Sequence, residues 1–81
     1  MRVTVRLFAR LRDIAGTGEL TRDLPAGATA GVLWDTLARD YAELGTYRDA
    51  VSTAVNAEYS KMNHPLADGD EVAFLPPVSG G

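Results

Sequence analysis

The chain has 81 residues, a net charge of −3, 46% hydrophobic residues and 23% charged residues. This composition is typical of a single small globular domain, which leaves little room for a deep catalytic cleft. There is no Lys/Arg cluster and no apolar run approaching the roughly 18 residues of a membrane span. We therefore expect no nucleic-acid partner, no membrane and no signal peptide, and the negative charge favours a basic protein partner.

Cysteine is absent, and His64 is the single histidine. Core packing alone must then stabilise the fold. The ligands of an iron–sulfur cluster are missing, and one histidine makes no credible zinc or copper site. We expect no metal and no cofactor. If the chain handles sulfur, the sulfur cannot sit on a thiol, and the terminal carboxylate is the natural carrier.

The N-terminal part of the sequence predicts two strands. Every second residue of segment 2–7 is apolar, which indicates a half-buried strand. Residues 10–16 are predicted to form a loop closed by a glycine. Segment 19–24 alternates again, with Leu20 and Leu24 facing inward, and a Pro-Ala-Gly sequence ends it.

One amphipathic helix is predicted after Thr29, a residue type favoured at helix N-caps. Gly31 in its first turn is unfavourable for the start, and Gly45 is predicted to end it. Apolar residues recur at intervals of three and four and form one face: Leu33, Trp34, Leu37, Ala38 and Tyr41. We expect this face to pack in the core.

The C-terminal part returns to strands. Residues 51–55 favour a strand that turns at Asn56-Ala57. Segment 59–66 is ambiguous, and Pro65 excludes a central strand there. An Asp-Gly-Asp turn leads into a last strand over 71–75. The order of elements predicts an α+β domain over residues 1–75, with the helix packed across one face of the sheet.

The last six residues form the most informative segment of the sequence. Two prolines fix φ and favour an extended backbone, and two terminal glycines carry no side chain that would block a narrow channel. Six residues at about 3.3 Å each reach roughly 20 Å. We interpret this tail as a chemical handle that enters the active site of another protein. It comprises Pro76, Pro77, Val78, Ser79, Gly80 and Gly81.

Two segments resemble the MoaD family, the small subunit of molybdopterin synthase: Ala-Val-Asn at 54–56 and the whole of 66–81. Phe8-Ala9, Arg12 and Gly16 extend the resemblance toward the N-terminus. The resemblance implies a ubiquitin-like β-grasp fold, in which one main helix packs across a mixed sheet and a flexible Gly-Gly tail follows.

The resemblance also implies that Gly81 is the working residue. An E1-like enzyme adenylates its carboxylate, and a sulfurtransferase converts it to a thiocarboxylate. The tail then enters the large synthase subunit, where the sulfur passes to a cyclic pyranopterin precursor and builds the dithiolene of molybdopterin. A heterotetramer and a cytoplasmic location are implied, with the catalytic groups in the large subunit. The chain is then not an enzyme by itself.

Side chains near the tail are candidates for the partner interface. Alternation allows only one of Phe74 and Leu75 into the core, and the other is ordinary surface or an apolar anchor. Arg12 matches a family position and either contacts the activating enzyme or is solvated. Three acids precede the tail and either steer a basic surface or simply form a turn: Asp68, Asp70 and Glu71.

Other functions share the tail and its activation chemistry. One class is a related sulfur carrier that serves thiamine, tRNA thiolation or cysteine synthesis, or a ubiquitin-like protein modifier. Another is an interaction domain whose glycines are inert. The Pro-Pro-Val-Ser lead-in and the Asp-Gly-Asp-Glu-Val strand favour the molybdopterin pathway.

Overall fold

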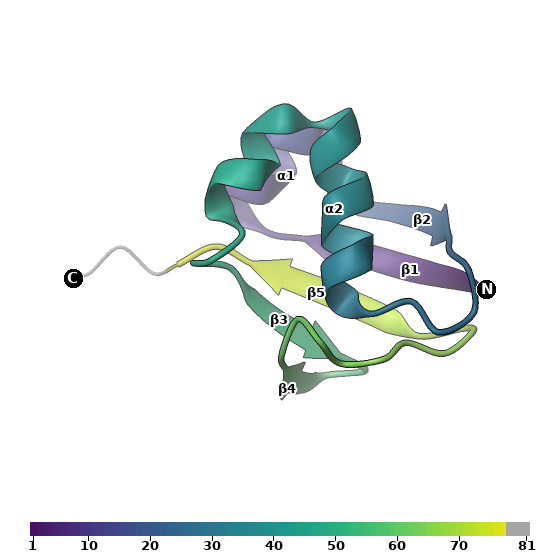
Figure 1. The fold of residues 1–81 in the computed structure, drawn as a ribbon. Coiled ribbons are helices and arrows are strands. Elements are labelled where there is room, and N and C mark those ends of the chain that lie inside the picture. Colours follow the sequence, from purple (N-terminus) through teal and green to yellow (C-terminus); the bar gives the residue numbers. More distant parts are fainter. Residues whose placement is uncertain (78–81) are drawn as a thin grey trace.

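A five-stranded sheet with helices on one face makes up the computed structural model, which describes residues 1–77 (Figure 1). In chain order the elements are β1 (Arg2–Leu7), α1 (Ala9–Ala15), β2 (Glu19–Asp23), α2 (Ala30–Asp40), the 3-10 helix η1 (Ala42–Tyr47), β3 (Ser52–Val55), β4 (Glu58–Ser60) and β5 (Glu71–Leu75). The strand order is β2-β1-β5-β3-β4. The central β1–β5 pair is parallel and the other pairs are antiparallel. The predicted α+β β-grasp fold with a mixed sheet is therefore confirmed.

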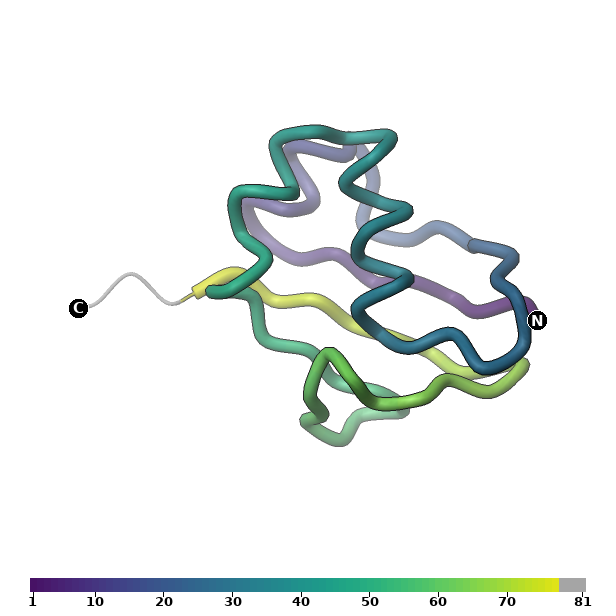
Figure 2. Tube along the Cα trace, viewed as in Figure 1, coloured from purple at the N-terminus to yellow at the C-terminus, as the bar shows by residue number. Residues whose placement is uncertain are grey.

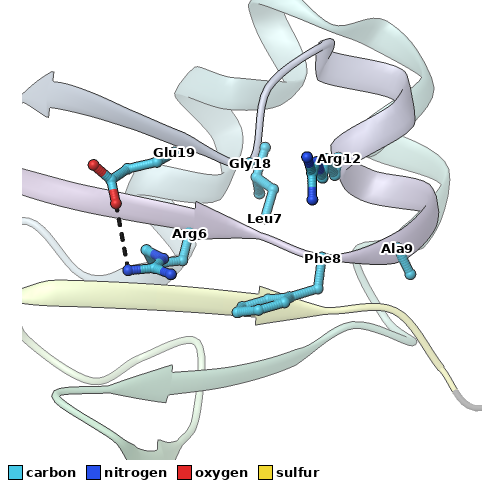
Figure 3. A pocket seen from close by; sticks show the side chains of 7 residues that line it. All are labelled: Arg6, Leu7, Phe8, Ala9, Arg12, Gly18 and Glu19. Atoms are coloured by element: carbon cyan, nitrogen blue, oxygen red, sulfur yellow. Dashed lines mark ion pairs between the residues drawn. The ribbon is translucent and has the colours of Figure 1, made fainter.

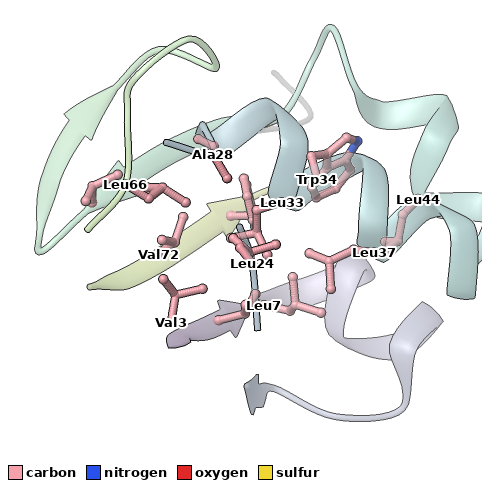
Figure 4. Close-up of a cluster of buried hydrophobic side chains, with 14 of the residues drawn as sticks. Val3, Leu7, Leu24, Ala28, Leu33, Trp34, Leu37, Leu44, Leu66 and Val72 are labelled. Atoms are coloured by element: carbon pink, nitrogen blue, oxygen red, sulfur yellow. The ribbon is translucent and has the colours of Figure 1, made fainter. Parts of the chain in front are cut away.

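The hydrophobic core lies between α2 and the sheet (Figure 4). Strand alternation sends Val3, Val5 and Leu7 of β1 to this side, and all three are buried. From α2, Trp34 and Leu37 meet them and are completely buried. Each such side chain stabilises the fold by roughly 1.5–3 kcal/mol relative to an exposed one. The predicted apolar helix face is therefore the core face.

Residues 10–15 belong to the helix α1 and do not form the predicted loop. Leu11 of α1 is completely buried, and Ile14 and Ala15, three and four residues later, pack against the core. Gly16 takes the left-handed conformation, with φ 77°, and its N–H donates to the carbonyl of Arg12 at 2.8 Å. The glycine expected to close a loop is the C-cap of a short helix.

The main helix starts as predicted but ends earlier. The hydroxyl of Thr29 accepts from the Val32 N–H at 3.3 Å and caps α2. The helix ends at Asp40, and Gly45, the predicted stop, lies inside η1. Leu44 of η1 is completely buried. The chain thus leaves α2 and tightens into η1, which places a further leucine in the core.

Gly31, unfavourable by propensity alone, is explained by a close approach of two backbones. Its N–H donates to the Met62 carbonyl at 2.7 Å. A Cβ at this position would lie 3.2 Å from that same oxygen and 3.2 Å from the Arg48 guanidinium. A glycine lets the connection between β4 and β5 pack directly on the first turn of α2.

The ambiguous segment 59–66 contributes an edge strand. β4 has three residues and pairs with β3 alone. Asn56 and Ala57, with φ 51° and 71°, form the turn between the two strands, as predicted. Pro65 takes part only in an isolated bridge with Thr29, in agreement with its exclusion from a central strand.

Candidate functional site

The tail begins at a fixed point in the sheet. β5 is held by β1 on one side and β3 on the other, with Phe74 opposite Leu7 and Leu75 opposite Ser52. The chain leaves β5 at the end of the molecule opposite the N-terminus (Figure 2). Pro76 is half-buried and Pro77 is exposed. Of the predicted tail, Val78, Ser79, Gly80 and Gly81 lie outside the described residues.

The last two residues of β5 face opposite sides of the sheet. Phe74 has no exposed surface, and its ring meets Trp34 edge-on, with 4.8 Å between ring centroids. Phe74 is therefore not available as a residue of the partner interface, because it has no exposed surface. Leu75 is half-buried and is the one of the two candidates that reaches the surface at the start of the tail.

The sheet surface turned away from α2, here called the open face, carries apolar side chains near the tail. Ala73 of β5 stands opposite Ala54 of β3, which stands opposite Tyr59 of β4. Tyr59 is 80% exposed and Phe8 is 40% exposed. In Figure 3 the Phe8 ring extends from the end of β1 toward β5. These residues, with Leu75, offer a partner an apolar surface that is continuous with the tail.

Sequence reasoning missed Phe8 and Tyr59 as interface candidates. The available signal was an apolar residue at a position where alternation predicts an exposed side chain. Phe8 follows the buried Leu7, and Tyr59 pairs with the outward-facing Ala54. An exposed aromatic side chain on a sheet face is informative only when its neighbours are also apolar, which requires the strand register.

Arg12 borders a shallow hollow of about 340 Å³ at the end of β1 (Figure 3). Its side chain packs over Gly18, so that a Cβ there would lie 3.2 Å from the Arg12 Cδ. Arg6, across the hollow, pairs with Glu19 at 3.3 Å and with Glu71 at 3.8 Å. Within residues 1–77, Arg12 makes no ion pair. Its exposed guanidinium is available to an acidic group of a partner.

The acids Asp68 and Asp70 build the turn before β5. The Asp70 carboxylate accepts from the Ala67 N–H at 2.8 Å and from the Asn56 amide at 2.9 Å. These hydrogen bonds, that from Ala67 above all, lower the pKa of Asp70. The Asp68 carboxylate accepts from the Arg2 N–H at 2.7 Å.

This acidic turn lies at the opposite end of β5 from the tail. The five residues of β5 separate the two by roughly 17 Å. The hydrogen bonds therefore account for Asp68 and Asp70 without a partner, and the steering role of the three acids stays a prediction. Glu71, the first residue of β5, forms an ion pair with Arg6 of β1.

No group of three or more His, Cys, Asp or Glu side chains among residues 1–77 is placed to hold a metal ion. No helix there has the length and apolar character needed to cross a membrane.

Comparison with known proteins places this geometry in a family. Residues 5–81 match the ThiS family. The chain belongs to the ThiS family. Within it, the chain is 39% identical over 83 residues to the molybdopterin synthase sulfur carrier subunit of Escherichia coli, covering 98% of this chain and 99% of that one. The resemblance seen in segments 54–56 and 66–81 is thus confirmed.

Two solved structures extend the ThiS-family comparison. Small archaeal modifier protein 1 of Haloferax volcanii is 33% identical over 84 residues, covering 94% of this chain and 97% of that protein. Its crystal structure superposes with a TM-score of 0.89, with complete coverage of both chains. A complex of subunits 1 and 2 of the molybdopterin-converting factor of Helicobacter pylori contains a chain that matches at 26% identity with a TM-score of 0.69, again with complete coverage of both chains.

Proposed function

We propose that this chain is the sulfur carrier subunit of a molybdopterin synthase and acts in molybdenum cofactor biosynthesis. The observation that carries the proposal is the 39% identity to the Escherichia coli sulfur carrier subunit across 99% of that subunit. The topology supports it, because the Pro-Pro-Val-Ser-Gly-Gly sequence directly follows β5, a strand paired on both sides.

Gly81 is the proposed site of sulfur attachment. A carboxylate is a poor electrophile, so an adenylating enzyme first converts it to an acyl-adenylate with ATP, which makes AMP the leaving group. A sulfurtransferase then supplies sulfur, and a thiocarboxylate replaces the carboxylate. The thiocarboxylate is ionised at neutral pH, and its soft sulfur is the nucleophile that is transferred to the pyranopterin precursor.

The rest of the molecule is proposed to present the tail to the large synthase subunit. Pairing on both sides of β5 fixes the point where the tail leaves, and the apolar open face lies beside that point. We propose that Leu75, Phe8 and Tyr59 contact the partner, with Arg12 at the rim. The tail over 76–81 then enters the partner's active site, where the acid–base groups reside. The Helicobacter pylori complex of subunits 1 and 2 supports such an assembly.

Protein modification is the second candidate function. It is favoured by the 33% identity to small archaeal modifier protein 1 and by the TM-score of 0.89. Both functions begin with adenylation of Gly81 and differ in the acceptor. Isopeptide adducts on lysines of other proteins would indicate modification, whereas a stable complex with a large synthase subunit would indicate sulfur transfer.

Deletion of Gly81 tests the proposal in a reconstituted synthase. We expect molybdopterin formation to be abolished, while the melting temperature and the complex with the large subunit are unchanged. The control is a variant with a full-length tail in which Gly69, in the turn before β5, is replaced with asparagine. Asparagine tolerates the φ of 88° that Gly69 adopts. Activity retained after deletion of Gly81 would contradict the proposed function.

A further inference from the structure

Ala9 has a backbone conformation that alanine rarely adopts. Its φ is 50°, in the left-handed region that an L side chain enters only at a cost and that glycine enters freely. Figure 3 shows Ala9 where the chain turns from β1 into α1. Leu7 before it and Leu11 after it are both buried, so the chain must change direction within this short connection. The fold therefore requires the turn.

The fold does not require the methyl group of this alanine. Ala9 is exposed and lies outside the hydrophobic core, so burial of its side chain contributes little that offsets the strain. Glycine would make the same turn with less strain, as Gly16 does at the other end of α1 with φ 77°. Backbone strain that is retained at an exposed position is typical of binding sites.

The neighbours of Ala9 belong to the proposed partner surface. Phe8 is 40% exposed, and the exposed Arg12 makes no ion pair within residues 1–77. The Phe8 carbonyl accepts from the Leu11 N–H at 3.0 Å and from the Arg12 N–H at 3.4 Å, so hydrogen bonds that span Ala9 link the two residues. Phe8, Ala9 and Arg12 line the same hollow of about 340 Å³.

We propose that Ala9 is a positioning residue for the partner interface. An alanine has far fewer accessible backbone conformations than a glycine. The methyl group of Ala9 therefore holds the connection in one conformation, and with it Phe8 and Arg12, before a partner binds. Less conformational entropy is lost when a partner binds a surface that is already ordered. The inference rests on the proposed function for the identity of this partner, the large synthase subunit.

Two alanine-to-glycine substitutions separate positioning from stability. Ala9→Gly removes the restriction beside Phe8. Ala57→Gly is the matched control, because Ala57 is also exposed and has a φ of 71°, but lies in the turn between β3 and β4. The neighbouring Asn56 amide donates to Asp70, which places this turn at the end of β5 away from the tail. Both substitutions relieve backbone strain, so each is expected to leave the melting temperature unchanged or to raise it by a few degrees.

Amide relaxation of the free protein, measured by NMR, and isothermal titration with the large synthase subunit test the positioning role. We expect Ala9→Gly to lower the order parameters of the Phe8 and Arg12 amides. We also expect it to weaken binding about five- to tenfold, which corresponds to the cost of fixing the backbone of one residue. Ala57→Gly is expected to change neither quantity.

Three results would overturn the inference: unchanged order parameters in Ala9→Gly, unchanged affinity in Ala9→Gly, or an equal loss of affinity in both variants. A lower melting temperature in Ala9→Gly would also overturn it, because the methyl group would then serve stability. The relaxation measurement needs no partner, so it judges Ala9 by itself. Failure of the native chain to bind the large subunit would instead contradict the proposed function.

Discussion

At the scale of single residues, β5 ends in two consecutive side chains that face opposite sides of the sheet, one in the core and one in the proposed interface. Phe74 is completely buried against Trp34, and Leu75 reaches the open face where the tail begins. Because side chains alternate along a strand, a substitution at one position leaves the other face intact. The two roles can therefore be measured separately.

Leu75→Glu is expected to weaken binding to the large synthase subunit at least tenfold, which corresponds to about 1.4 kcal/mol, with little change in melting temperature. Phe74→Ala should instead cost about 3–5 kcal/mol of folding free energy, because it empties a core position. Isothermal titration and thermal unfolding measure the two effects. Val32→Glu is the matched control, since Val32 is 41% exposed but lies on α2, on the other side of the sheet. Equal loss of binding in both glutamate variants would contradict the open-face interface.

Asp70 gives the fold a defined pH dependence. Hydrogen bonds from the Ala67 N–H and the Asn56 amide lower its pKa in the folded state. A lowered folded-state pKa stabilises the protein above the unfolded value of about 3.9, and this contribution is lost as the pH falls through the folded-state pKa. Asp70→Asn should therefore reduce stability at neutral pH and flatten its dependence on pH below about 4. Urea unfolding across this range measures the effect, and parallel curves for the two proteins would contradict it.

At the scale of elements, the sequence was most informative where burial is periodic. β1 and β5 alternate over their full lengths, and α2 has a continuous apolar face, so all three were predictable. α1 was missed because seven residues carry only one completely buried side chain, Leu11. η1 was missed because no local sequence pattern predicts it. It places Leu44 in the core, where the contacts of this side chain are with other segments of the chain.

The two glycines of the segments that the sequence did not predict, Gly16 at the end of α1 and Gly45 in η1, allow a matched pair of substitutions. Gly16 has φ 77° and open space around it, so Gly16→Ala should cost about 1 kcal/mol through backbone conformation alone. In Gly45→Ala the added Cβ would meet the Ala38 Cβ at an ordinary 3.8 Å, and we expect no loss or a small gain in stability. Thermal unfolding measures the stability of both variants. A larger loss of stability in Gly45→Ala than in Gly16→Ala would contradict the assigned helix ends.

At the scale of the whole molecule, the C-terminal tail could be predicted from the sequence, whereas the surface beside it could be identified only from the folded structure. The Gly-Gly end and its Pro-Pro lead-in can be recognised in the sequence. The surface beside the tail cannot, because its residues come from four different segments that only the strand register brings together: Phe8 after β1, Ala54 of β3, Tyr59 of β4 and Leu75 of β5. The same register places the acids Asp68 and Asp70 far from the tail they precede in sequence.

The proposed role of the domain is to hold the start of the C-terminal tail in a fixed position. Its core fixes β5, β5 fixes the start of the tail, and the open face gives a partner a surface to grip. In this account the body determines which proteins receive the tail, and Gly81 performs the chemistry. The proposed chemistry changes one atom of the chain, the terminal oxygen of Gly81 that sulfur replaces.

The most direct test is the mass of the C-terminal peptide of the protein isolated from its own cells while they make the cofactor. The account predicts a fraction of chains with one sulfur in place of one oxygen at Gly81. The peptide must be measured as well as the intact chain, because oxidation of Met1 or Met62 shifts the intact mass almost equally. A complete tail that carries no sulfur under these conditions would contradict the sulfur-carrier account and favour a protein modifier.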